Sequence, residues 1–193
     1  MKTPTYLNTA LSLIVALLAL AAPRADAAGA KHKELIDFSI QEVERDGAEM
    51  RPIRKYTWTS GDWKDKIRFL PKQGLLVPFL GGKGNFGGDK SAKLSEYGFF
   101  EVMLVIGNRN KAQNIRVILT DGDDTEAVWE LPLAGKPPGQ SLVYRLPLDK
   151  PDREDKPGKK TGFDKSKLRK WQVSGNWQEA ETEVLIERFL AGQ

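Results

Sequence analysis

The fold is decided by the stretch Asn114-Ile-Arg-Val-Ile-Leu-Thr-Asp-Gly-Asp-Asp-Thr-Glu-Ala-Val-Trp-Glu-Leu131, which carries the pattern of a β-hairpin. Inward and outward positions alternate in both arms, and this period of two is typical of half-buried strands. Between the arms, Asp121-Gly-Asp-Asp124 favours a turn, because glycine tolerates positive φ and aspartate side chains bond nearby backbone. The alternation predicts these inward-facing residues: Ile115, Val117, Leu119, Ala127, Trp129 and Leu131.

Short strand patterns recur on both sides of this hairpin. Phe99–Ile106 is largely apolar on both faces, which is typical of a central strand. Further strand candidates are residues 34–39, 66–70, 75–79, 141–146, 171–174 and 183–190. These roughly eight or nine short strands, with turns every ten residues or so and no long amphipathic helix, predict one all-β domain, an antiparallel β-sandwich.

Three connecting segments complete this prediction. The glycine-rich residues 81–88 are predicted as a loop that lets backbone approach a ligand, or as a long connection. Residues 175–177 are predicted as a turn. The charged residues 149–170 are predicted as a solvated loop in which Asp164 caps a short turn, with a patch that meets an anionic polysaccharide or a membrane surface as the alternative.

The N-terminal residues have the features of a secretory signal peptide. Lys2 precedes an apolar run at residues 10–22, and Ala25-Asp-Ala27 resembles a cleavage site. The run is shorter than the roughly twenty residues of a membrane-spanning helix. We therefore expect residues 1–27 to be removed, residues 28–193 to form a single secreted or periplasmic domain, and no membrane span to remain. An uncleaved N-terminal anchor is the alternative.

Composition excludes several classes of function. The chain has no cysteine, so disulfides and thiol chemistry are absent. Its formal net charge of +4 is mild and lacks the concentrated basic stripe of a nucleic-acid-binding protein. The only histidine, His32, lies in a polar leader, and no Gly-x-Ser-x-Gly motif accompanies it, which argues against a serine hydrolase.

Paired carboxylates of the kind that glycosidases use are not evident. The acidic groups near one another in sequence lie in the hairpin turn and at the start of the last predicted strand, at Asp121, Asp123 and Asp124 and at Glu181 and Glu183. Glycoside hydrolysis needs two carboxylates held about 5–10 Å apart across the substrate. A glycan hydrolase or lyase is therefore the least favoured reading, and the chain is predicted not to be an enzyme.

Polar side chains of the middle strands form the candidate ligand site. If the apolar face is inward, then Arg116, Glu130, Arg145, Gln172 and Ser174 point outward together, and such groups suit sugar hydroxyls. An aromatic ring stacked under the sugar would complete the site, and the loop or strand-end aromatics that could supply it are Trp58, Trp63, Phe86 and Trp177. The alternatives are cross-strand ion pairs on a wet surface and tryptophans packed in the core or its rim.

The order of these segments resembles a known family. The stretches that carry the resemblance are Leu35-Ile-Asp-Phe-Ser39, Leu94-Ser-Glu-Tyr-Gly98 after the glycine cluster, Arg116-Val-Ile-Leu-Thr-Asp-Gly-Asp123, Trp129-Glu-Leu-Pro-Leu133, Tyr144-Arg-Leu-Pro-Leu148, residues 163–168, Trp171-Gln-Val-Ser-Gly-Asn-Trp177 and Val184-Leu-Ile-Glu-Arg-Phe-Leu190. Together they resemble the galactose-binding-like jelly rolls of carbohydrate-binding modules. The same pattern is similar to complex I intermediate-associated proteins, which share the fold without binding sugar.

This resemblance implies two functions and one ion. The first function is that of a secreted, non-catalytic carbohydrate-binding module that takes a polysaccharide or oligosaccharide. The second is that of a structural or assembly module without sugar binding. Family members often bind a structural calcium ion, and Asp37 and Glu187 stand at the matching positions, with glutamate where aspartate is usual. Calcium needs six to eight oxygen ligands, so other groups would have to complete its shell.

Overall fold

The computed structural model describes residues 32–37, 44–46, 49–51, 57–63, 66–70, 74–155 and 162–193. The predicted signal peptide, residues 1–27, lies outside this range. Within the described part of the chain, no helix is long and apolar enough to cross a membrane.

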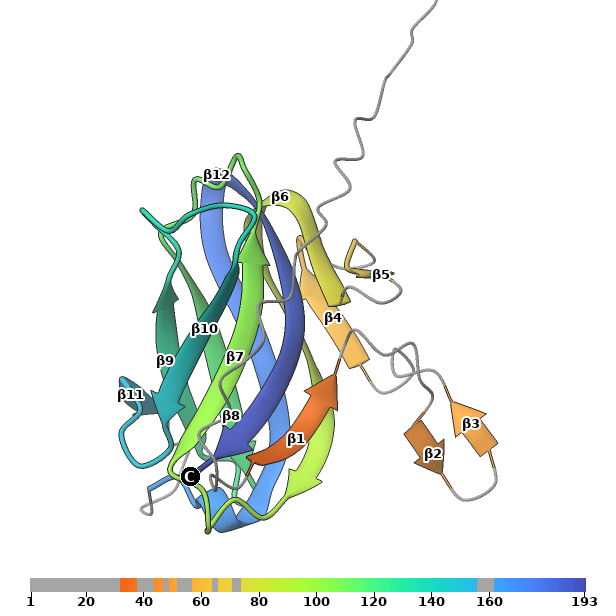
Figure 1. Cartoon of the computed structure of the whole chain (residues 1–193), viewed down its shortest axis with the longest axis vertical. Helices are drawn as coiled ribbons and strands as arrows, with labels where there is room; N and C mark the ends of the chain where they lie inside the picture. The colour runs from red at the N-terminus through yellow and green to blue at the C-terminus, as the bar shows by residue number, and fades with distance from the viewer. Residues whose placement is uncertain are drawn as a thin grey trace, which may run out of the picture.

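The described residues form an antiparallel β-sandwich of two layers, as the sequence predicted (Figure 1). Hydrogen bonding follows the strand order β10-β7-β12-β8-β9-β11, with β1 and β6 also paired to β12, and β4 and β5 paired to β6. The strands are β1 (His32–Asp37), β2 (Glu44–Asp46), β3 (Glu49–Arg51), β4 (Thr57–Gly61), β5 (Arg68–Leu70), β6 (Gly74–Ala92), β7 (Phe99–Ile106), β8 (Asn114–Asp121), β9 (Glu126–Pro132), β10 (Ser141–Pro147), β11 (Arg153–Asp155) and β12 (Leu168–Gly192). A 3₁₀ turn, η2 (Lys165–Lys167), precedes β12, and β2 pairs with β3 in a separate two-stranded sheet.

The two long strands β6 and β12 run through both layers. Residues 168–174 of β12 pair with β8, whereas residues 184–192 pair with β7. Between these parts the register of β12 against β6 shifts repeatedly, from Asn176 to Val184. One layer, called here the β8 layer, therefore holds β11, β9, β8, the first part of β12, the second part of β6 and β4. The other, the β7 layer, holds β10, β7, the second part of β12, the first part of β6 with β5, and β1.

Two predicted breaks in the chain are continuous strand instead. Residues 81–88 belong to β6 rather than to a loop, and residues 175–177 belong to β12 rather than to a turn. The glycines serve packing: a Cβ placed on Gly84 would lie 2.1 Å from Cγ of Trp63, so only glycine leaves room for that buried indole. Gly82 adds a positive φ of 80°, a backbone conformation that glycine adopts without strain.

Aromatic rings form a continuous chain through the core. Ring centroids lie 6.3 Å apart for Trp63 and Phe86, 5.8 Å for Phe86 and Trp171, 5.1 Å for Trp171 and Phe189, and 5.3 Å for Phe189 and Phe100. These are separations at which edge-on and tilted rings attract one another. This series of ring contacts crosses from the β8 layer to the β7 layer, so it joins the two layers.

The central hairpin has the predicted strands and the predicted facing. All six residues predicted to point inward are in the core. In the turn, Oδ1 of Asp121 accepts the backbone N–H groups of Asp123 and Thr125 at 2.8 and 2.9 Å, and Oδ2 accepts that of Asp164 at 2.9 Å. Asp164 in turn caps η2 by accepting the N–H of Ser166, as predicted. The buried Asp121 carboxylate therefore fixes the turn and the start of β12 to each other.

Candidate functional site

A row of polar residues crosses the outward face of the β8 layer. Register pairs Ser60 with Asn85, Asn85 with Ser174, Ser174 with Arg116, and Arg116 with Glu130. These five residues, called here the polar row, come from β4, β6, β12, β8 and β9. Because neighbouring strands lie about 4.8 Å apart, the row is about 19 Å long. On β6, β12, β8 and β9 its members stand next to core residues, so these four face away from the core, although Ser174 is only 6% exposed.

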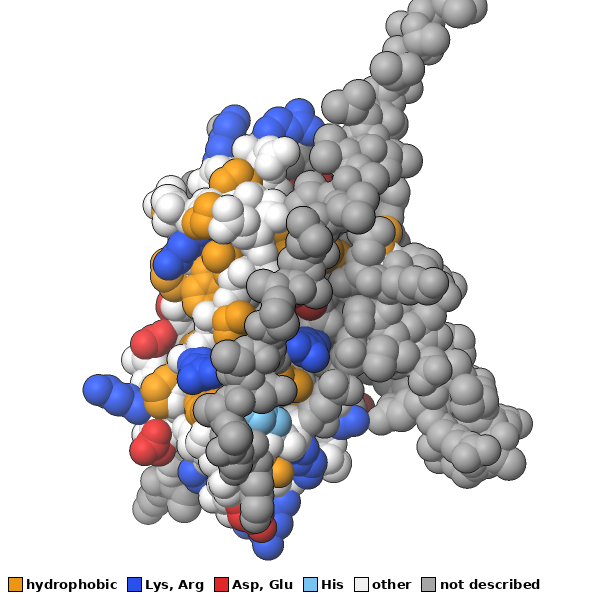
Figure 2. Space-filling model, in the orientation of Figure 1, with side chains coloured by type: hydrophobic (Ala, Val, Ile, Leu, Met, Phe, Trp, Pro, Cys, Tyr) orange, Lys and Arg blue, Asp and Glu red, His pale blue; other side chains and the backbone are white. Residues whose placement is uncertain are grey.

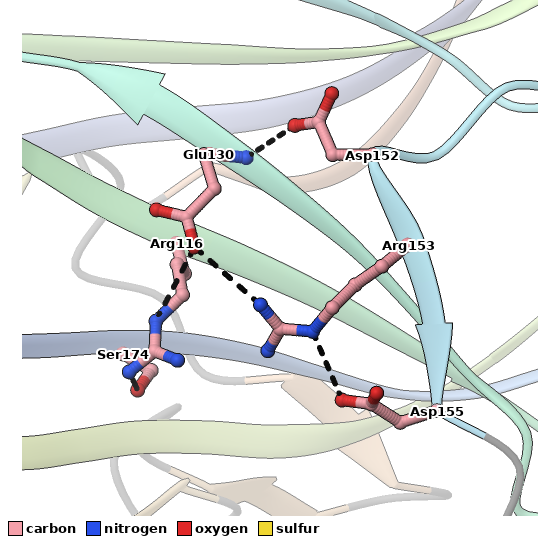
Figure 3. A network of polar contacts seen from close by, with 6 residues as sticks. All are labelled: Arg116, Glu130, Asp152, Arg153, Asp155 and Ser174. Atoms are coloured by element: carbon pink, nitrogen blue, oxygen red, sulfur yellow. Dashed lines mark hydrogen bonds and ion pairs between the residues drawn. The ribbon is translucent and has the colours of Figure 1, made fainter.

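Weak ion pairs and a hydrogen bond order the centre of this row (Figure 3). Arg116 Nη2 donates to Ser174 Oγ at 3.3 Å, and Arg116 Nε lies 4.0 Å from Glu130 Oε1. The same Glu130 oxygen lies 3.6 Å from Arg153 Nη1 on β11, and Arg153 Nε lies 3.3 Å from Asp155 Oδ2. The Arg116 and Glu130 side chains are 23% and 36% exposed, so both are partly desolvated yet accessible.

Both ends of the row are also held. Ser60 Oγ donates a hydrogen bond to Asn85 Oδ1 on the neighbouring strand. At the other end, the backbone N–H of Glu130 donates to Asp152 Oδ2 at 2.7 Å (Figure 3). Asn85, Asp152 and Arg153 were missed from the sequence, because Asn85 stood in the predicted glycine loop and the other two in the predicted charged loop.

A second set of residues lies beside the polar row on the same face. Gln172 is half-buried and pairs with Ile118 on one side and with Gly87 on the other. Gly87 also pairs with Trp58 on β4. The side chains of Trp58 and Trp177 lie outside the described residues, so their predicted role in stacking stays a prediction.

Glu126 lies on the same face, four residues before Glu130 on β9. It pairs with Thr120 on β8 and with Asp155 on β11. Burial raises the pKa of the Glu126 carboxyl, Asp155 raises it further, and the charge of Arg153 opposes both effects.

Arg145 does not share this face, which corrects the sequence-based grouping. It lies on β10 in the β7 layer, where its Nε donates to Oε2 of the buried Glu101 at 3.1 Å. Its guanidinium carbon also lies 4.9 Å from the centre of the Phe99 ring. Alternation tells which residues of a strand share a face, but it does not tell to which layer the strand belongs.

Two of the predicted stacking residues are in the core instead. Trp63 and Phe86 are 0% and 1% exposed, so neither ring offers a surface to a ligand. Phe86 pairs in register with the buried Val173, and Trp63 fits against Gly84. Trp129 is also in the core, where the sequence predicted it, and so is Trp171.

The predicted calcium pair is only partly described. Asp37 pairs in register with Arg188, the residue next to Glu187, so the backbone brings the two predicted ligands close together. Glu187 Oε2 already accepts the hydroxyl of Ser141 at 2.7 Å. Across the described residues, no three His, Cys, Asp or Glu side chains gather as metal ligands would. The described groups do not complete a calcium shell by themselves, and calcium binding stays a prediction.

Comparison with known proteins defines the fold class. No protein-family model matches the sequence, and no curated protein matches it. Among solved structures, a family 11 carbohydrate-binding module from Clostridium thermocellum, in complex with a β-1,3-1,4-mixed-linked tetrasaccharide, has a TM-score of 0.54 and 12% identity over 83% of this chain and 94% of that one. The family 11 module of a cellulosomal cellulase from the same organism has a TM-score of 0.53 and 12% identity over 83% of this chain and 94% of that one.

An agarase is similar over part of its length, with a TM-score of 0.54 and 12% identity. The match covers 82% of this chain but only 26% of the agarase, so the chain spans about a quarter of that enzyme. At such low identity the likeness shows the fold alone. The chain has the jelly-roll β-sandwich fold of carbohydrate-binding modules, as the sequence resemblance predicted.

Proposed function

We propose that this chain is a secreted, non-catalytic protein that binds a polysaccharide or oligosaccharide along the polar row. The row itself is the observation that carries the proposal. Sugar hydroxyls both donate and accept hydrogen bonds, and the row offers both kinds of partner. Arg116 donates, Glu130 accepts, and the hydroxyls and the amide of the other members do either.

The energetics favour exchange of these contacts for a ligand. Ion pairs between accessible side chains contribute only about 0–1 kcal/mol, and the 4.0 Å separation of Arg116 and Glu130 makes theirs a loose one. A hydrogen bond to a charged group contributes about 1.5–3 kcal/mol when it is well formed. The sheet holds the row in place before a ligand arrives, so little ordering entropy would be lost on binding.

The remaining parts of the proposal have separate support. Secretion is supported by the predicted signal peptide at residues 1–27 and by the likeness to carbohydrate-binding modules. A non-catalytic role is supported by Asp121, whose carboxylate is occupied by three backbone N–H groups and is therefore structural.

The second candidate is a structural or assembly module without sugar binding. Two observations favour it: Trp63 and Phe86 are in the core, and Arg116 and Glu130 already have partners within the sheet. The two candidates differ in a single measurable property, which is affinity for a glycan.

Affinity electrophoresis of the purified protein against soluble polysaccharides tests this, with mixed-linked β-glucan and agar-type galactans among them. We expect retardation by at least one glycan, and the Arg116→Ala variant should lose it. Arg145→Ala is the matched control, because Arg145 lies on β10 in the other layer and should leave the retardation unchanged. Absence of binding to every glycan would favour the assembly module. Equal losses in both variants would place the site away from the polar row.

A further inference from the structure

A separate pocket of about 250 Å³ lies between two loops at one end of the sandwich. Residues 107–113 connect β7 to β8, and residues 133–140 connect β9 to β10, at the upper end of the molecule in Figure 1. The buried side chains of Ile106, Ala112 and Leu133 underlie the pocket. The exposed polar side chains that line it are Asn108, Lys111, Gln113 and Lys136.

Backbone hydrogen bonds join the two loops. The N–H groups of Leu133 and Ala134 donate to the carbonyl of Gln113 at 2.8 and 3.2 Å, and that of Gly139 donates to the carbonyl of Ile106 at 2.9 Å. The pocket is therefore preformed, and a ligand would not have to order its walls.

The Asn110 side chain stabilises the loop of residues 107–113 by two hydrogen bonds. Its Nδ2 donates to the carbonyl of Ala112 at 3.1 Å, and its Oδ1 accepts the hydroxyl of the buried Thr182 on β12. The neighbouring Gly107 N–H donates to the carbonyl of Glu183 at 2.8 Å. Asn110 is thus used by the fold, whereas the exposed lining residues leave polar groups at the pocket.

The charge of the pocket is positive. Lys111 and Lys136 line it, Arg109 stands in the same loop as Lys111, and neither loop contains an acidic residue. Figure 2 shows Lys and Arg side chains gathered at this upper end of the molecule. On a facing element, the exposed Glu183 of β12 lies against Gly107, a pocket-lining residue: a Cβ placed on that glycine would lie 3.0 Å from Oε1 of Glu183.

Neither pocket lysine is neutralised by a carboxylate of the described chain. Lys136 Nζ lies 6.0 Å from the centre of the Tyr144 ring, which is a weak attraction at the limit of cation–π range. Lysine ammonium groups act as strongly hydrated point charges that suit an anion of any shape. The amides of Asn108 and Gln113 can pair with hydroxyl groups beside such an anion.

We propose that this pocket is a second binding site, separate from the polar row, for the carboxylate or sulfate of an acidic saccharide. The saccharide part of this proposal rests on the proposed function. The ammonium groups of Lys111 and Lys136 bind the anionic group, and the lining amides bind neighbouring hydroxyls. The pocket favours acidic saccharides over neutral ones, while the polar row binds the sugar chain itself.

The test is calorimetric titration of the whole protein with four probes: an oligogalacturonate, a sulfated oligosaccharide, a neutral oligosaccharide of similar length and inorganic sulfate. We expect an acidic oligosaccharide to bind about tenfold more tightly than the neutral one, equivalent to about 1.4 kcal/mol. Whichever of the two acidic probes binds more tightly identifies the anionic group. The preference should shrink as salt is raised, because ions screen exposed charges.

The double variant Lys111→Gln/Lys136→Gln should lose this preference and keep its affinity for the neutral probe. Lys150→Gln is the matched control, since it removes an exposed lysine outside the pocket. Arg116→Ala should weaken the neutral probe and keep the acidic preference. Retention of the preference in the double variant, or inorganic sulfate binding as tightly as the oligosaccharides, would overturn the second site. Absence of binding by all three saccharides would instead overturn the proposed function.

Discussion

Replacing Trp129 with alanine should remove much of the stability of the sandwich. The indole is 2% exposed, its N–H donates to the carbonyl of Pro147 at 3.2 Å, and its ring lies edge-on to Phe163 at 6.4 Å. Tryptophan-to-alanine changes in cores cost about 3–5 kcal/mol, since the lost transfer energy adds to that of the cavity. The lost ring contact of about 0.5–1.5 kcal/mol places Trp129→Ala at the upper end of this range.

For a chain of 193 residues, each kcal/mol lowers Tm by about 2–4 °C, so we expect a fall of about 10–20 °C. Circular dichroism during heating measures the fall in Tm, and circular dichroism in guanidinium chloride measures the loss in unfolding free energy. Trp129→Phe is the control, because it keeps most of the apolar surface and loses the N–H bond to the Pro147 carbonyl, which also accepts the N–H of Lys150, at a cost of about 1–2 kcal/mol. A Trp129→Ala protein within about 1 kcal/mol of the wild type would refute this account of the core.

Three further perturbations test other parts of the molecule. Gly84→Ala should destabilise strongly, because its Cβ would lie 2.1 Å from Cγ of Trp63, whereas Gly98→Ala meets no atom within 4 Å and serves as the control in denaturant. Glu126→Gln should raise Tm at neutral pH but not well below the ordinary pKa of 4.5. The raised pKa of Glu126 means that folding favours its protonated carboxyl. This contribution to stability is present at low pH and is lost as pH rises through the folded-state pKa. An equal change in Tm at both pH values would therefore contradict the raised pKa of Glu126. If the predicted calcium ion binds, calcium should raise Tm and a chelator should lower it, and a Tm that responds to neither would exclude a structural ion.

Features that depend on local sequence were predicted correctly. The facing of the central hairpin follows from alternation over seven-residue or eight-residue strands, and alternation needs no knowledge of the partner strand. The cap at Asp164 and the turn at Asp121 are likewise interactions between residues close in sequence. These interactions are local, so a single sequence is enough to predict them.

Features that depend on strand order were not predictable in the same way. Arg145 and Arg116 both alternate with apolar residues, yet β10 pairs with β7 and β8 pairs with β9 and β12. The two arginines therefore lie on different layers. The layer of a strand is set by pairing between residues far apart in sequence, and the sequence of the strand itself does not record it.

The glycine cluster was predicted as a loop because glycine is depleted in ordinary strands. Here the glycines belong to strand β6, where neighbouring side chains are crowded. At Gly84 the missing side chain admits Trp63 to the core, which explains how a tryptophan with loop-like sequence neighbours becomes fully buried. The same packing removes Trp63 from the surface. The glycine at position 84 therefore accounts for two wrong predictions, the loop at residues 81–88 and the stacking role of Trp63.

The burial of Trp63 and Phe86 narrows where a stacking ring for the proposed saccharide could come from. Of the four predicted aromatics, Trp58 and Trp177 remain. Trp58 stands two residues from Ser60 on β4, and Ser60 is the end member of the polar row. The backbone of Trp58 is in register with Gly87 on β6, and Gly87 pairs in turn with Gln172 on β12. A stacking ring would therefore have to come from Trp58 or Trp177, while Arg116 and Glu130 would bind the sugar hydroxyls at the centre of the polar row.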